Sequence, residues 1–287
     1  MRLFNPDSTH WYRRDGEPLH SVPSAKGDPR PTTLRDARKL GLLPSVTNVL
    51  GVIAKPELTA WLQEQAVMAA LTLPRAAGEP EDAFARRVVE DSLTTRDNAA
   101  EFGTAFHRGA ERVAQTLEVE PEHPAADWLR HYRDWYQAQV AALHWTERTL
   151  VEPLRGFAGT ADLLVEHREH GLCLVDLKTM KVRAGDKPRP YRSWCYQLAA
   201  YRDAVVTGDE RPVKCLNLIV NSLQAGPPVE HLWTEEELES GLEAFYAAHR
   251  LWCIEKAYEP GDGQSPVIRH QSAVAGGEGG KLPVLVA

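Results

Sequence analysis

The stretch that decides the fold reads Gly156-Phe-Ala-Gly-Thr-Ala-Asp162 and resumes, after a short polar run, as Leu172-Cys-Leu-Val-Asp-Leu-Lys178. Both segments are rich in Leu and Val, which favours strands, and the run between them ends in a glycine that favours a turn. We therefore predict a β-hairpin. If its loop is centred near Glu169, Asp162 lies opposite Asp176, with the two Cβ atoms roughly 5 Å apart.

Strand alternation adds a lysine to this pair of carboxylates. Asp176 and Lys178 point to one face of the strand, whereas Leu177 points into the core. Two carboxylates at this range can share a hard divalent cation such as Mg²⁺ or Mn²⁺, and a neighbouring lysine can orient water and offset phosphate charge. The pattern predicts metal-dependent phosphodiester hydrolysis. Asp-Leu-Lys alone would be an ordinary tripeptide on a strand edge, so the neighbouring segments decide.

Three neighbouring segments carry further polar candidates. A helical pattern around residues 100–111 has an apolar stripe, and His107 lies near the edge of that stripe. A second helix, over residues 194–201, places Gln197 and Tyr201 four residues apart on one face. Between these helices, residues 145–152 read as a strand that carries two acidic residues, Glu147 and Glu152.

The order of these motifs resembles that of the PD-(D/E)XK nuclease superfamily. The similarity is greatest to the branch that contains the RecB nuclease domain, phage exonucleases and the mitochondrial genome-maintenance exonuclease. An additional segment, Leu43-Pro-Ser-Val-Thr-Asn-Val-Leu50, resembles a Pro-Ser-Val-Thr motif near the front of the phage and mitochondrial members. The resemblance spans about residues 43–222.

The resemblance implies a role for each motif. Asp162, Asp176 and the Leu177 carbonyl would bind the metal together with His107, and Lys178 would be the catalytic lysine. Glu147 matches the acidic residue that precedes the Gly-Thr-Ala-Asp strand, and Glu152 competes for this role because sequence does not fix the register. Gln197 and Tyr201 match a Gln-x-x-x-Tyr element that holds the active-site strands and contacts nucleic acid.

Several of these residues have simpler explanations. A histidine beside an apolar helical face is often a structural or surface residue. Gln197 and Tyr201 could simply border a packing surface. Ser45 and Thr47 could contact phosphate, cap the following apolar run, or do both.

Composition indicates a globular protein. The chain has 287 residues, of which 43% are hydrophobic and 25% charged, as expected for one elaborated domain or two packed lobes. No segment predicts a membrane span or a secretory signal, so we expect a cytoplasmic protein that does not bind membranes. The four cysteines form no Cys-x-x-Cys pair and none precedes residue 173, so we expect no disulfide, zinc site or iron–sulfur cluster.

Charge distribution predicts where nucleic acid would bind. The net charge of −7 argues against coating nucleic acid by bulk attraction. Residues 178–192, however, contain six basic residues and one acidic residue, directly after the predicted site. Such a loop could grip a phosphate backbone or be an ordinary solvated loop. The candidate DNA-binding residues here are Lys181, Arg183, Lys187, Arg189 and Arg192.

We expect an α/β fold, with a mixed central β-sheet flanked by helices in a restriction-endonuclease-like core and an N-terminal helical lobe. The predicted segments are an irregular arm or short hairpin over residues 1–44, a helical lobe over 45–143, a nuclease core over 144–260 and a flexible tail over 261–287. Helices are predicted near 57–71, 81–93, around His107, 123–143, around Gln197 and from a capping box at Thr234 and Glu237 to about residue 258. Strands are predicted near 145–152, 158–166, 172–179, 213–222 and 229–233.

The sequence thus favours a Mg²⁺- or Mn²⁺-dependent DNA exonuclease of phage type, acting in replication, recombination or repair. An endonuclease of the same fold is the first alternative. A non-catalytic DNA-binding or scaffold protein and a hydrolase of small phosphate esters are the others. We expect free ends to be required and single strands to be preferred, because the many helical residues before the sheet resemble a cover over the DNA path.

Overall fold

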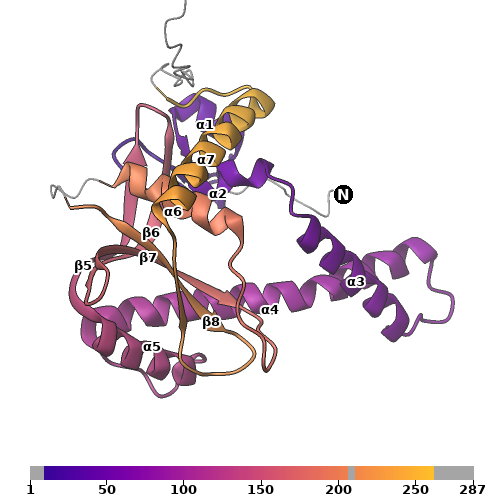
Figure 1. Ribbon diagram of the computed structural model, residues 1–287. Coiled ribbons are helices and arrows are strands. Elements are labelled where there is room, and N and C mark those ends of the chain that lie inside the picture. Colours follow the sequence, from indigo (N-terminus) through magenta and orange to yellow (C-terminus); the bar gives the residue numbers. More distant parts are fainter. Residues whose placement is uncertain (1–9, 206–210, 262–287) are drawn as a thin grey trace, which may run out of the picture.

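The computed structural model describes residues 10–205 and 211–261. Its centre is a five-stranded sheet in the order β5-β6-β7-β8-β9, shown in Figure 1. The strands are β5 (Val140–Glu152), β6 (Phe157–His167), β7 (Gly171–Met180), β8 (Lys214–Asn221) and β9 (Val229–Leu232). Only β7 and β8 run parallel, because helix α6 (Arg192–Ala204) connects them. The predicted mixed α/β fold is confirmed.

The β6–β7 hairpin has the predicted register. Leu163 pairs with Val175 and Leu164 with Leu174, which is the alignment that places Asp162 opposite Asp176. Strand β8 is buried along nearly its whole length, as its continuous apolar sequence predicts. Backbone pairing and burial therefore hold the central strands in place, and with them the side chains at the strand ends.

Helices cover both faces of the sheet (Figure 1). On one face, α6 and α7 (Glu235–Lys256) pack together with α1 (Leu34–Leu40) and α2 (Val46–Val49). On the other face lie α5 (Ala126–Gln139) and the C-terminal part of α4 (Glu81–Thr116), which buries Phe106, Ala110 and Val113. The predicted capping box at Thr234 and Glu237 opens α7.

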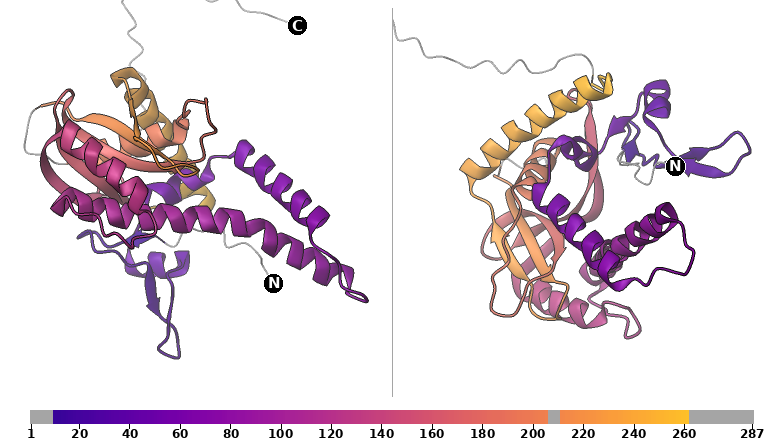
Figure 2. Two further views of the ribbon diagram at one scale, coloured as in Figure 1. Left: turned by 90° about the horizontal axis from the view of Figure 1, so that it is seen from below. Right: turned by 90° about the vertical axis from the view of Figure 1, so that its right-hand side faces the viewer.

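Helix α4 is longer than predicted. The sequence suggests a helix near 81–93 and a separate one around His107, but the structure joins them into one helix of 36 residues. No glycine or proline interrupts residues 94–101, so nothing ends the helix there. Figure 2 shows that α3 (Pro56–Thr72) and the start of α4 extend beyond the sheet. His107 lies further along the same helix.

Two other segments can be compared with the expectations. The helix predicted to reach residue 143 ends at Gln139, and β5 begins at Val140, where its β-branched side chain is buried against the sheet. Within residues 1–44, where an irregular arm or a short hairpin is predicted, the described part forms a hairpin, β2 (Ser21–Pro23) with β3 (Pro29–Pro31). Helix α1 follows, opened by a Thr33–Asp36 capping box, and was not predicted.

The start of the described chain is part of the core. Strand β1 (Trp11–Tyr12) pairs with β4 (Leu43–Pro44), and the Trp11 ring packs 6.1 Å from that of Trp252. A short 3₁₀ helix, η1 (Leu50–Val52), follows α2. Most of the predicted tail, residues 262–287, lies outside the described residues. The division of the chain into separate domains stays a prediction. Over residues 10–205 and 211–261, no helix is both long and apolar enough to cross a membrane.

Candidate active site

The end of the β6–β7 pairing brings the first predicted residues together. The ladder's last pair is Leu163 with Val175, and beyond it the Asp162 carboxylate accepts the Leu177 backbone N–H at 2.6 Å. The Lys178 Nζ lies 2.8 Å from Oδ2 and 3.0 Å from Oδ1 of the buried Asp176. Two carboxylates and an ammonium thus occur at one end of the hairpin, as the sequence predicts.

Helix α4 adds His107 to this group. Its Nδ1 lies 3.5 Å from Oδ1 of Asp162, so a side chain of α4 and a side chain of β6 come together here. Burial opposes the charged form of both groups, but their mutual attraction outweighs it. The pKa of His107 is accordingly raised and that of Asp162 lowered.

Strand β5 contributes Glu147 rather than Glu152. Glu147 offers a carboxylate oxygen within 4.8 Å of the ligand atoms of both His107 and Asp162. Its backbone has φ of 44°, a left-handed conformation that is uncommon for a residue other than glycine and often marks a functional site. The Glu152 carboxylate instead accepts the N–H groups of Leu154 and Arg155 in the following turn. The register that the sequence left open therefore places Glu147 at the cluster.

Two carboxyl groups near Asp162 have raised pKa values. Burial and the charge of Asp162 raise the pKa of Asp176 to about 6, although Lys178 opposes the shift. Desolvation and the charge of Asp162 raise the pKa of Glu147 to about 7. Carboxylates crowded at one place in this way favour a bound cation, because a cation relieves their repulsion.

Helix α6 holds the lysine from the other side. Lys178 Nζ donates to Gln197 Oε1 at 3.0 Å, and Gln197 Nε2 donates to the Tyr201 hydroxyl at 3.2 Å. Tyr201 in turn packs against Gly159, where an added Cβ would lie only 2.7 Å from the ring. The Gln-x-x-x-Tyr element therefore positions Lys178, and its glycine partner on β6 makes room for the tyrosine.

The predicted phosphate contacts fall into two groups. Ser45 is buried and caps α2 by accepting the Asn48 N–H at 3.0 Å, whereas Thr47 is exposed. In the β7–α6 loop the basic side chains are all exposed, and within the described chain none forms a salt bridge. These are Lys181, Arg183, Lys187 and Arg189 in the loop itself, with Arg192 at the first position of α6. The loop therefore presents unpaired positive charge to solvent.

Sequence reasoning missed a buried amide behind Asp176. Asn217 on β8 is aligned with Asp176, and its Nδ2 donates to Asp176 Oδ2 at 2.7 Å. Trp233 Nε1 donates to Asn217 Oδ1 at 2.7 Å. The available signal was a single asparagine inside the apolar run Cys215-Leu-Asn-Leu-Ile-Val220, where a polar group needs partners.

A second group of potential ligands, His167, His170 and Glu230, fits a metal poorly. His167 Nδ1 accepts the backbone N–H groups of Glu169 and His170, so the ring proton resides on Nε2 and faces Glu230. In a histidine that binds a metal, the ring nitrogen that does not bind the metal usually carries the proton and donates it to a carbonyl or carboxylate. Here that nitrogen, Nδ1, accepts instead. The two rings also stack, at 4.5 Å and 11°. This group is a hydrogen-bonded support for the β6–β7 turn.

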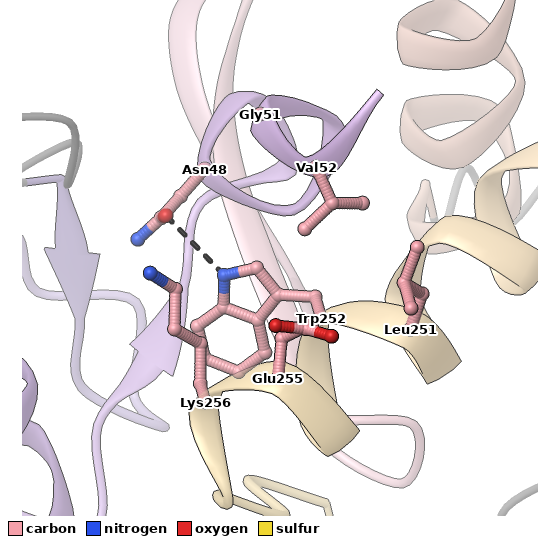
Figure 3. Close-up of a pocket in the computed structure, with 7 residues that line it drawn as sticks. All are labelled: Asn48, Gly51, Val52, Leu251, Trp252, Glu255 and Lys256. Atoms are coloured by element: carbon pink, nitrogen blue, oxygen red, sulfur yellow. Dashed lines mark hydrogen bonds between the residues drawn. The ribbon is translucent and has the colours of Figure 1, made fainter. Parts of the chain in front are cut away.

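A surface pocket of about 390 Å³ lies between the α2–η1 segment and the end of α7 (Figure 3). Its lining includes Trp252, whose indole N–H donates to Asn48 Oδ1 at 3.4 Å, and none of the candidate catalytic residues. The candidate catalytic residues therefore lie at the end of the β6–β7 hairpin and not in this pocket.

The chain belongs to the PD-(D/E)XK nuclease superfamily. The family model matches residues 81–250, more than half of the chain, and the match includes every member of the cluster described above. A search of curated proteins gives no match.

Two solved structures are similar at low identity. One is a provisionally named exonuclease from Eubacterium rectale, with 11% identity, a TM-score of 0.38, and coverage of 71% of this chain and 86% of that one. The other is SSO0001, with 12% identity, a TM-score of 0.31, and coverage of 67% and 86%.

The two glutamates of β5 give a paired prediction. Glu147→Gln should slow DNA hydrolysis about a hundredfold, because it removes a charge that faces the reaction centre. Glu152→Gln should leave the rate within about twofold and instead cost about 1 kcal/mol of stability through its weakened turn contacts. Initial rates and thermal unfolding of both variants measure this, and a reversed ranking would transfer the role to Glu152.

Proposed function

We propose that the protein is a Mg²⁺- or Mn²⁺-dependent DNA exonuclease of the RecB-like and phage branch of its superfamily. The observation that carries the proposal is the convergence of Lys178 with the acidic and histidine cluster at the end of one hairpin. A non-catalytic scaffold would not need a complete set of these groups. Replication, recombination or repair inside the cell, in the manner of a phage exonuclease, is the role that this activity suits.

The residues present fit a hard divalent cation. His107, Glu147 and Asp162 offer ligand atoms within 4.8 Å of one another, and oxygen ligands predominate, as Mg²⁺ and Mn²⁺ require. Asp176 and the Leu177 carbonyl would complete the set, as in the family pattern. When bound, the cation supplies positive charge against the phosphate and lowers the pKa of water, which generates a nucleophile near neutral pH.

The protein's own groups then orient the reactants. Lys178 is held between Asp176 and Gln197, so its ammonium is fixed before substrate arrives. A cation fixed in a partly buried site stabilises developing phosphate charge more than a mobile one in water. From that position the Lys178 ammonium can also donate a hydrogen bond to the attacking water and so orient a lone pair of that water toward phosphorus.

The basic β7–α6 loop is suited to the DNA backbone. It begins where β7 ends, two residues after Lys178, so a strand whose phosphate enters the site would pass along it. Exposed basic side chains without acidic partners gain the most from phosphate, because no existing ion pair is lost. Thr47 is accessible for a further contact, whereas Ser45 acts chiefly as the α2 cap.

The exonuclease hypothesis is tested by whether hydrolysis needs a free DNA end. The arm formed by α3 and the first part of α4 projects from the sheet (Figure 2) and is continuous with the part of α4 that carries His107. We take such an arm to favour a threaded strand over a clamped duplex. We expect linear single-stranded DNA to be degraded progressively from a terminus, linear duplex more slowly, and closed circles not at all. Gel analysis of matched linear and circular substrates over time measures this. Rapid cutting of a closed single-stranded circle would instead indicate an endonuclease with the same metal site.

A further inference from the structure

The strand next to the active site carries an amide that the sheet core does not require. Asn217 is 0% exposed and lies between Leu216 and Leu218, which are also fully buried. Burying an amide costs stability unless its hydrogen bonds are made, so an apolar residue here would pack at lower cost. The contacts of this side chain therefore indicate what it is for.

Asn217 links Asp176 to Trp233. Its Nδ2 donates to Asp176 Oδ2 at 2.7 Å, and its Oδ1 accepts from Trp233 Nε1 at 2.7 Å. An indole nitrogen can only donate, so Trp233 fixes which end of the amide is oxygen and which is nitrogen. The NH₂ group must then face the carboxylate. Trp233 follows β9 and is itself buried, so the whole relay is shielded from water.

The relay restricts one oxygen of Asp176. Oδ2 accepts a hydrogen bond from Asn217 Nδ2 and lies 2.8 Å from Lys178 Nζ. Among the described residues, Oδ1 accepts a hydrogen bond only from Lys178 Nζ, at 3.0 Å. Lys178 contacts both oxygens at similar distances, so its contacts alone do not distinguish the two oxygens. Asn217 approaches from β8, where it is aligned with Asp176, and of the two carboxylate oxygens it bonds to Oδ2 alone.

We propose that Asn217 is a positioning residue that sets the Asp176 carboxylate for cation binding, and that Trp233 sets Asn217. The inference rests on the proposed function, since it concerns the same site. Groups that orient metal ligands typically change metal affinity by 10- to 100-fold when they are removed. The relay should therefore be visible in metal binding itself, before any DNA is present.

The variants Asn217→Leu and Trp233→Phe test the relay, and Trp252→Phe is a matched control. Trp252 is also buried and also donates its indole N–H to an asparagine, Asn48, but away from the site. Mn²⁺ binding is measured by calorimetry without DNA, alongside thermal unfolding and the kcat and KM for linear DNA. We expect Mn²⁺ affinity to fall about tenfold in Asn217→Leu and by a smaller factor in Trp233→Phe.

In Trp252→Phe the unfolding temperature should fall while Mn²⁺ affinity stays unchanged. At saturating Mn²⁺, the two relay variants should regain part of their kcat, with KM for DNA unaltered. Wild-type Mn²⁺ affinity in a folded Asn217→Leu, or in Trp233→Phe if the first variant does not fold, would overturn the relay. If the relay is overturned but the wild-type protein binds Mn²⁺ and cleaves DNA, the proposed function still holds. If the wild-type protein neither binds Mn²⁺ nor cleaves DNA, the proposed function and the relay are both overturned.

Discussion

The Lys178→Ala variant is expected to hydrolyse DNA at least about a hundredfold more slowly than the wild-type protein. Lys178 is the cation held by Asp176 and Gln197 beside the proposed reaction centre. Its loss removes charge stabilisation from the transition state and leaves Asp176 buried without its ion-pair partner. The rate of nucleotide release under single-turnover conditions measures this loss.

Two measurements make the lysine result specific. Mn²⁺ binding should persist in Lys178→Ala, because the acidic residues and His107 remain, so the defect should appear in the chemical step. Lys26→Ala is the matched control, since Lys26 lies exposed in the turn between β2 and β3. A Lys178→Ala protein with undiminished turnover would remove this lysine from the mechanism.

Removal of divalent metal is expected to abolish hydrolysis completely. EDTA should stop nucleotide release, and excess Mg²⁺ or Mn²⁺ should restore it in the same sample. Ca²⁺ should bind but support little turnover, because its longer and more variable coordination positions a water molecule less well. The rates with each ion after dialysis measure this dependence.

Binding should also stabilise the folded protein. Burial and the charge of Asp162 raise the pKa values of both Glu147 and Asp176, so a cation beside them would favour their charged forms. A cation that binds only the folded state raises the unfolding temperature with its concentration. Hydrolysis that survives thorough chelation, with no thermal shift on adding Mn²⁺, would exclude a metal site here.

The central hairpin could be predicted because its information is local. The alternation of β6 and β7 and the length of the turn fix the alignment of Asp162 with Asp176, and the structure has that register. The same logic places Gln197 and Tyr201 on one helical face. Short-range geometry decides each of these relations.

Relations between distant segments could not be predicted in this way. Nothing in the helical pattern of α4 says which strand His107 meets; only the family resemblance suggested it. The choice between Glu147 and Glu152 depended on how β5 aligns with β6, and the positive φ at Glu147 is a tertiary feature without a clear sequence signal. Asn217 acquires its meaning only when β8 lies beside β7.

Helix ends were missed for a related reason. Residues 94–101 are polar and lack a strong apolar stripe, so the periodicity fades, yet helix-compatible residues continue α4 through them. Conversely, the α5 pattern continues past Gln139, but pairing with β6 draws Val140 and its neighbours into the sheet. Tertiary pairing overrides local preference at such junctions.

The most direct test of the account is one comparison of wild-type protein with Asp176→Asn, purified in parallel. Asparagine keeps the size of the side chain but cannot carry the negative charge of a ligand carboxylate. Release of nucleotides from linear DNA is measured with Mn²⁺, and again after EDTA. We expect metal-dependent release by the wild-type protein and at least about a hundredfold less by the variant. Equal release by the two proteins would contradict it.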